Sequence, residues 1–172
     1  ELTMPWLTGS KLGFGVQSSG VAIPPMEISG GTKTTHGSYT VHTFLSSGTL
    51  VVKDAKSNLS DVALIVVAGG GGGGRGNHNE GAGGGGAGGV VKHPGATLTK
   101  GSTATGSYTI TVGAGGNGYF GSPTGAGDGT QGEDSSCVVS PTVTYTAKGG
   151  GYGPFMNPGN PGGSAGGGGG GG

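Results

Sequence analysis

Uninterrupted runs of glycine constrain this chain more than any other feature of its sequence. Glycine supplies 48 of the 172 residues, and the run Gly69–Gly74 directly follows an apolar stretch at 61–68. Glycine loses more backbone entropy on folding than any other residue, so such runs are usually flexible linkers. Here the runs contain alanine but little serine, and they lie between candidate strands, not between domains. These features favour ordered glycine segments whose backbone groups are hydrogen-bonded.

Packed polyglycine II helices are the ordered form that we expect for these runs. Such an extended helix has three residues per turn and rises about 3.1 Å per residue, so Gly69–Gly74 would span roughly 19 Å. It has no internal hydrogen bonds, but its N–H and C=O groups can bond to neighbouring segments that approach closely because no Cβ intervenes. A β-strand of five or six residues has a similar length, so strands and glycine helices can lie side by side.

Short β-rich stretches precede the glycine runs. Residues 37–53 are rich in β-branched and aromatic residues and predict a hairpin with a turn at Ser46-Ser47-Gly48. The near-continuous apolar stretch 61–68 predicts a buried strand, and 107–112 alternates as a second strand. Residues 137–147 indicate either a strand pair split by Pro141 or one bulged edge strand.

The fold class follows from these elements. No segment shows a helical period with caps, so we expect almost no α-helix. The prediction is an all-β fold with a β-sandwich-like core and glycine-rich loops that pack as polyglycine II helices.

Two regions differ in composition. Residues 1–30 contain the only tryptophan, Trp6, and the pair Pro24-Pro25, and they predict an extended N-terminal arm that packs on the body or on a neighbouring subunit. Residues 31–172 form the predicted glycine-rich β domain. The chain starts at Glu1 and stops within a glycine run, so we expect a processed chain or a fragment whose domain continues beyond residue 172.

Charge and cysteine content exclude several classes of protein. Eight basic and eight acidic residues cancel, and no cluster of Lys or Arg is present, which argues against a nucleic-acid partner. The sequence has no stretch of 18 apolar residues, so we expect no membrane insertion. Cys137 is the only cysteine, so an intrachain disulfide is impossible.

The sequence contains no complete motif for catalysis or for a cofactor. Gly113–Gly118 fits the GxGxxG spacing after a strand, but a turn-like sequence follows where a dinucleotide site needs a helix. The histidines lack metal-ligand spacing, and the acidic residues Asp128, Glu133 and Asp134 lack the EF-hand pattern. We therefore expect no enzyme activity, no cofactor and no metal.

Candidate binding residues interrupt the glycine blocks. The polar insertion Arg75–Glu80 breaks the glycine pattern and predicts an exposed loop, and aromatic residues stand inside other glycine segments. Exposed aromatic and polar side chains among small residues suit contact with a carbohydrate or a protein. The alternative is that the aromatic rings only fill gaps between glycine helices. The candidates are Arg75, Asn77, His78, Asn79, Glu80, Tyr119, Phe120, Tyr152 and Phe155.

The order of the blocks resembles the glycine-rich domain of phage tail-fibre, tail-tip and related adhesin proteins. The blocks are, in order, SYTVHTFLSSGTLVV, DVALIVVAGGGGGG, GAGGGGAGGVV, GSYTITVGAGGNG and TYTAKGGGYG, within residues 30–155. The resemblance implies a β-sandwich-like core with glycine-rich loops and a role in the virion tail, commonly in binding the host surface. It carries over no catalytic motif and no specific binding residue.

From this resemblance we expect an extracellular, virion-associated homo-oligomer whose partners are other virion subunits and a glycan or protein receptor on the bacterial surface. A purely architectural virion protein, such as a fibre shaft or a capsid decoration, is the main alternative. A cellular extracellular glycine-rich module or an ice-binding glycine-helix protein is a further one, although the irregular glycine spacing argues against ice binding.

Overall fold

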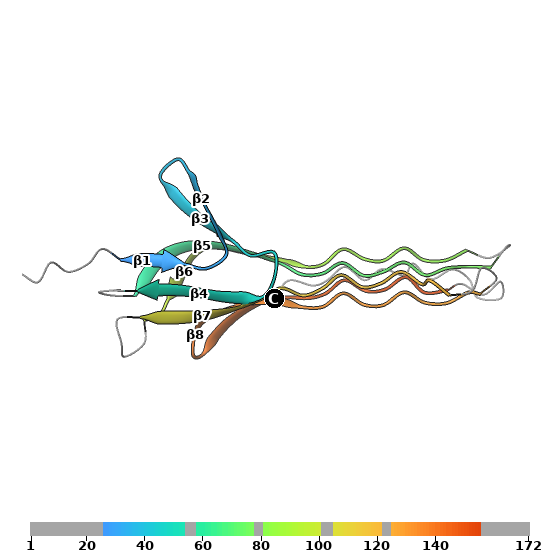
Figure 1. Cartoon of the computed structure of the whole chain (residues 1–172). Helices are drawn as coiled ribbons and strands as arrows, with labels where there is room; N and C mark the ends of the chain where they lie inside the picture. Colours follow the sequence, from blue (N-terminus) through green and yellow to red (C-terminus); the bar gives the residue numbers. More distant parts are fainter. Residues whose placement is uncertain (1–25, 54–57, 78–80, 101–104, 122–124, 156–172) are drawn as a thin grey trace, which may run out of the picture.

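The computed structural model describes residues 26–53, 58–77, 81–100, 105–121 and 125–155. Figure 1 shows the strands gathered at one end, with glycine segments running side by side from them to a distant far end. The described residues contain β-strands and extended segments but no helix. The predicted all-β class is therefore confirmed.

Two antiparallel sheets form the body of the molecule. The larger sheet has the strand order β1-β4-β7-β8-β9, and β5 pairs with β6 in the smaller one. The turn between β8 and β9 contains Pro141, so the strand-pair interpretation of 137–147 is the correct one. The strands are β1 (Glu27–Ser29), β4 (Gly48–Lys53), β5 (Leu59–Val67), β6 (Val90–Leu98), β7 (Gly106–Thr111), β8 (Ser135–Ser140) and β9 (Val143–Ala147).

The core lies between these sheets, as in a sandwich. Val52, Leu98, Tyr108 and Val139 are 1–4 % exposed and come from both sheets. Burial raises the pKa of Tyr108, whose hydroxyl donates a hydrogen bond to the carbonyl of Thr99 at 3.1 Å. A second cluster, which includes Val66, Val91 and Ala147, is buried where the strands meet the glycine segments.

The β5 strand is buried on one face only. Val66 is buried, whereas its neighbours Ile65 and Val67 are 66 % and 57 % exposed. The apolar run predicted a buried strand; the strand exists, but it is buried on one side, because only the inner face of the β5–β6 sheet packs against the other sheet.

The predicted hairpin across 37–53 was also wrong. Its strands exist, but β3 (Tyr39–Thr43) pairs with the preceding β2 (Thr32–His36), while β4 pairs with β1 and β7. The reason is the two-residue turn at Gly37-Ser38, where Gly37 adopts a left-handed φ of 59° that closes β3 onto β2. The β2–β3 hairpin projects from the body (Figure 1).

The predicted N-terminal arm contains a strand that the sequence reasoning missed. Glu27–Ser29 forms β1 and pairs antiparallel with β4 at the edge of the larger sheet. Residues 1–25 of the arm lie outside the described residues. The strand β6 was missed as well, because Pro94-Gly95 obscures its pattern.

Five glycine segments, named here I to V, continue from the strands. Segment I follows β5 and segment II leads back into β6; segment III follows β7 and segment IV leads back into β8; segment V follows β9. Segments I, III and V run away from the strands, and each therefore extends a strand that the sandwich core holds in place. The segments are I (68–77), II (81–89), III (112–121), IV (125–134) and V (148–155).

The hydrogen bonds between these segments repeat every three residues, as polyglycine II helices require. Segment I is bonded to all four others with N···O distances of 2.7–3.1 Å. Bonds also join segment II to V, V to IV and IV to III. In segment I, the N–H groups of residues 68, 71 and 74 donate to segment II, and those of residues 69, 72 and 75 donate to segment IV. The carbonyls of residues 70 and 73 accept from segment III, and the carbonyls of residues 69 and 72 accept from segment V.

Close approach explains why glycine is needed inside the bundle. A Cβ on Gly72 would overlap the carbonyl group of Asn117 in segment III, and one on Gly132 would overlap the carbonyl of Gly69 in segment I. A branched or bulky side chain at these positions would push the segments apart and break the backbone hydrogen bonds between them.

Candidate functional site

The far end of the bundle carries side chains that the stem lacks. Away-running segments I, III and V all reach this end, and segments II and IV start there (Figure 1). The described residues at the ends of segments I, III and V include Arg75, Phe120 and Phe155. We call the set Arg75, Asn77, Tyr119, Phe120, Asp128 and Phe155 the distal tip.

Arg75 joins three of the segments. Its N–H donates to the carbonyl of Gly127 at 2.9 Å, and its carbonyl accepts from the N–H of Gly127 at 3.0 Å. Its guanidinium Nη1 donates to the carbonyl of Gly121 at 3.4 Å, and the residue is half-buried. The backbone of Arg75 thus ties the end of segment I to segment IV, and its side chain ties it to segment III.

Two neighbouring aromatic residues of segment III lie differently. Tyr119 is half-buried, and its ring covers Gly121 and Gly127 so closely that a Cβ on either glycine would overlap it. Phe120 is 89 % exposed. Tyr119 therefore fills a gap between glycine segments, as the alternative interpretation predicted, whereas Phe120 presents its ring to the surroundings.

Phe155 ends segment V beside segments II and IV. It forms an isolated antiparallel bridge with Ala82, and its N–H donates to Oδ1 of Asp128 at 2.7 Å. The exposed carboxylate of Asp128 thus fixes segment V at the tip. Sequence reasoning considered Asp128 only as a possible calcium ligand, without an EF-hand pattern; its position between two glycines of a polyglycine segment was the available signal.

The structure brings some of the predicted residues together and leaves others apart. Arg75, Tyr119, Phe120 and Phe155 meet at the tip, and exposed Asn77 follows Arg75. His78, Asn79 and Glu80 lie outside the described residues. Tyr152 is 43 % exposed but stands three residues before Phe155, roughly 9 Å back along the stem.

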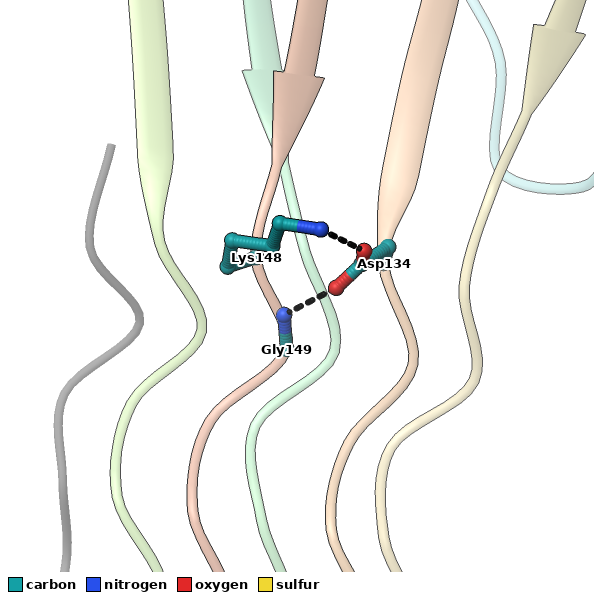
Figure 2. A network of polar contacts seen from close by, with 3 residues as sticks. All are labelled: Asp134, Lys148 and Gly149. Atoms are coloured by element: carbon teal, nitrogen blue, oxygen red, sulfur yellow. Dashed lines mark hydrogen bonds and ion pairs between the residues drawn. The ribbon is translucent and has the colours of Figure 1, made fainter. Parts of the chain in front are cut away.

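An ion pair stands at the root of the bundle, away from the tip. Figure 2 shows Asp134 of segment IV beside Lys148 and Gly149, which both belong to the neighbouring segment V. Lys148 Nζ and the N–H of Gly149 donate to its carboxylate at 2.7 and 2.8 Å, and these bonds lower the pKa of Asp134. The pair joins two segments where they leave β8 and β9, so its role is structural.

Few groups in the described ranges are suited to catalysis or metal binding. They contain no cluster of three or more His, Cys, Asp or Glu side chains that could hold a metal ion. Burial raises the pKa of the Cys137 thiol, which disfavours the nucleophilic thiolate. The tip offers the exposed ring of Phe120, the half-buried guanidinium of Arg75, and amide and carboxylate groups. These groups can bind a ligand.

No helix in the described part of the chain is long and apolar enough to cross a membrane.

No curated protein and no solved structure matches the chain. The model of one protein family, described as a glycine-rich domain, matches residues 45–172. That match begins just before β4 and includes every glycine segment of the bundle. Because it spans well over half of the sequence, the chain belongs to this family of glycine-rich domains.

Proposed function

We propose that this protein is a receptor-binding module of a phage tail fibre or tail tip, which holds its distal tip against the bacterial surface. The observation that carries the proposal is that a stem of hydrogen-bonded glycine segments ends in a tip with exposed side chains. Segment I extends about 22 Å from Ala68 to Arg75 at the rise of a polyglycine II helix. Phe120, 89 % exposed, stands at the end of this stem.

The bundle is suited to presenting a small contact surface. Its segments are joined by backbone hydrogen bonds in several directions, so the stem resists bending without a conventional apolar core. The described ends of the segments at the tip are in turn joined by Arg75 and Asp128. A pre-organised contact surface loses less entropy on binding than a mobile one, which favours affinity from a small contact area.

The chemistry of the tip suits a sugar or a protein loop. An exposed phenylalanine ring can stack on the apolar face of a sugar or fill a small pocket, and Asn77 and Asp128 can hydrogen-bond to hydroxyl or amide groups. Aromatic residues and arginine are also the residues that most often dominate binding energy at protein interfaces.

Binding of the fluorescent full chain to a panel of bacteria tests the proposal. Purified envelope polysaccharide and protease treatment of the cells separate a glycan receptor from a protein receptor. We expect saturable binding that Phe120→Ala weakens at least tenfold. Tyr39→Ala is the matched control, because Tyr39 is 72 % exposed on the β2–β3 hairpin at the other end of the molecule. Absence of saturable binding, or equal binding by both variants, would contradict the proposal.

An architectural role in the virion is the second candidate. The projecting β2–β3 hairpin favours it, because every residue of β2 and most of β3 are exposed and a two-stranded hairpin gains stability from a partner. In that case Tyr39→Ala would impair assembly with other virion subunits, and Phe120→Ala would have no effect on cells.

A further inference from the structure

One face of the glycine bundle carries no side chain larger than a methyl group. It is formed by the outward positions of segments I, II and III, and we call it the glycine face. A Cβ on Gly84 would meet nothing within 4 Å, and one on Gly70, Gly73, Gly115 or Gly118 would meet its first atom at 3.5–3.7 Å. Side chains therefore fit here, yet the chain has none. The glycine face consists of Gly70, Gly73, Gly84, Ala87, Gly115 and Gly118.

The hydrogen-bond pattern explains why this face is open. A helix with three residues per turn packs with up to six neighbours. Around segment I the neighbours II, V, IV and III follow one another, each bonded to the next. Of the six neighbour positions around segment I, two adjacent ones, between segments II and III, hold none of the described segments. In keeping with this, the N–H groups of Gly70 and Gly73 have no acceptor within the described ranges.

The face continues into an apolar patch on the β body. Stepping back by three residues from Gly70 leads to Val67, and stepping forward by three from Ala87 leads to Val90. Val67 and Val90 are paired in the β5–β6 sheet and are 57 % and 56 % exposed, and Ile65 beside them is 66 % exposed. Lys92, the register partner of Ile65, borders this patch.

The opposite side of the bundle has the reverse character. Segments IV and V carry polar side chains there: Asp128, Gln131 and Asp134 on segment IV and Lys148 and Tyr152 on segment V. Most polar residues of the stem thus lie on segments IV and V, although segment III carries the exposed Asn117. A contiguous apolar surface opposite a polar one indicates an interaction surface.

We propose that the glycine face and the adjoining β5–β6 patch bind a second copy of this chain in a two-fold face-to-face pair. A flat face without side chains approaches closely only a surface that is equally flat, and the chain supplies one. Within the bundle the same contact already exists, because Gly129 and Gly132 of segment IV pack against the carbonyls of Gly72 and Gly69. The six residues of the glycine face are uncharged, so two copies meet without repulsion.

The area is sufficient for a reversible dimer. Three segments spaced about 5 Å apart over about 22 Å cover roughly 330 Å², and the two-stranded patch adds roughly 160 Å². Two copies would bury about 1,000 Å² in total, which is at the lower limit of specific interfaces. This predicts a dimer whose population depends on concentration in the micromolar range.

Sedimentation velocity of the full chain, with no bacteria present, tests this proposal independently of receptor binding. The wild-type mass should rise from the 16.2 kDa of one chain toward twice that value with concentration. Gly84→Glu and Gly115→Glu place a carboxylate in the face at positions where a Cβ fits, and each should raise the dimer dissociation constant at least tenfold. Gln131→Glu adds the same charge on the opposite side and should dimerise like the wild type.

The outcomes that would overturn the proposal are distinct. A wild-type chain that stays at the monomer mass would do so, and so would equal dimerisation of Gly84→Glu and Gln131→Glu. A monomeric wild type that shows thermal hysteresis in freezing assays, lost in Gly84→Glu, would assign the face to ice. Melting temperatures of all variants, measured alongside, verify that the bundle is intact.

Discussion

A comparison of two adjacent glycines provides a test of the polyglycine II packing. Gly72 and Gly73 stand in the same run, but Gly72 is buried between segments, whereas Gly73 faces outward. A methyl group on Gly72 would overlap the carbonyl group of Asn117, and one on Gly73 would meet the carbonyl of Gly83 at an ordinary 3.7 Å. We therefore expect Gly72→Ala to destabilise the fold and Gly73→Ala not to destabilise it.

The magnitude follows from the bonds that must give way. Room for the methyl group requires segment III to move away from segment I, which stretches the bonds from Gly116 to Gly70 (2.7 Å) and from Tyr119 to Gly73 (3.1 Å). A buried donor left without its acceptor costs about 1–3 kcal/mol, so two such bonds suggest a loss of about 3 kcal/mol. In a domain of this size that corresponds to a fall in Tm of about 6–12 °C. Gly73→Ala should raise the stability by up to about 1 kcal/mol through lower entropy of the unfolded chain.

Thermal unfolding followed by circular dichroism or calorimetry measures both variants under identical conditions. Dilute protein keeps any association between copies from contributing to the Tm. Equal Tm values for Gly72→Ala and Gly73→Ala would refute the argument, because they would mean that the segments do not approach closely enough to exclude a Cβ.

Three further predictions concern other parts of the molecule. Lys148 and the Gly149 N–H lower the pKa of Asp134 below its usual value of about 4, so its contribution is present above about pH 4 and lost as the pH falls through the folded-state pKa. Asp134→Asn should therefore flatten the acid side of a plot of Tm against pH. Val139→Ala in the core, 2 % exposed, should cost about 2 kcal/mol in denaturant titrations, whereas Val143→Ala, 42 % exposed, should cost far less. Iodoacetamide should alkylate Cys137 slowly at neutral pH in the folded protein and rapidly in denaturant, because burial raises the pKa of its thiol.

The sequence predicted the elements of the fold better than their partners. The strand-then-glycine order and the absence of helix could be read directly, because periodicity and composition are local properties. The pairing of β3 could not, since it depends on the left-handed φ of Gly37 and on β2, whose Thr-rich sequence gives little apolar alternation. The one-sided burial of β5 depends on which sheets stack, and that is a property of the whole chain.

Only part of the candidate site could be predicted from the sequence, again because the sequence reports local properties. A polar or aromatic residue inside a glycine block is conspicuous, so Arg75, Phe120 and Phe155 could be singled out from the sequence. Their meeting at one end follows from the similar lengths of segments that start from one sandwich. The bond between Asp128 and the Phe155 N–H joins residues 27 apart, so the sequence around Asp128 could mark this residue but could not identify its partner.

The bundle separates the stability of the stem from the chemistry of its tip. Apart from the Arg75 guanidinium at the tip, the bonds that join segment I to its neighbours run from backbone N–H to backbone C=O, so they do not depend on the identity of any side chain. What the stem demands of its sequence is the absence of a Cβ at inward positions such as Gly72, Gly132 and Gly150. Exposed tip residues such as Phe120 contribute nothing to those bonds, and their replacement leaves the lattice intact. A chain built in this way can exchange the exposed side chains of its tip without losing its fold, because the two sets of constraints fall on different residues.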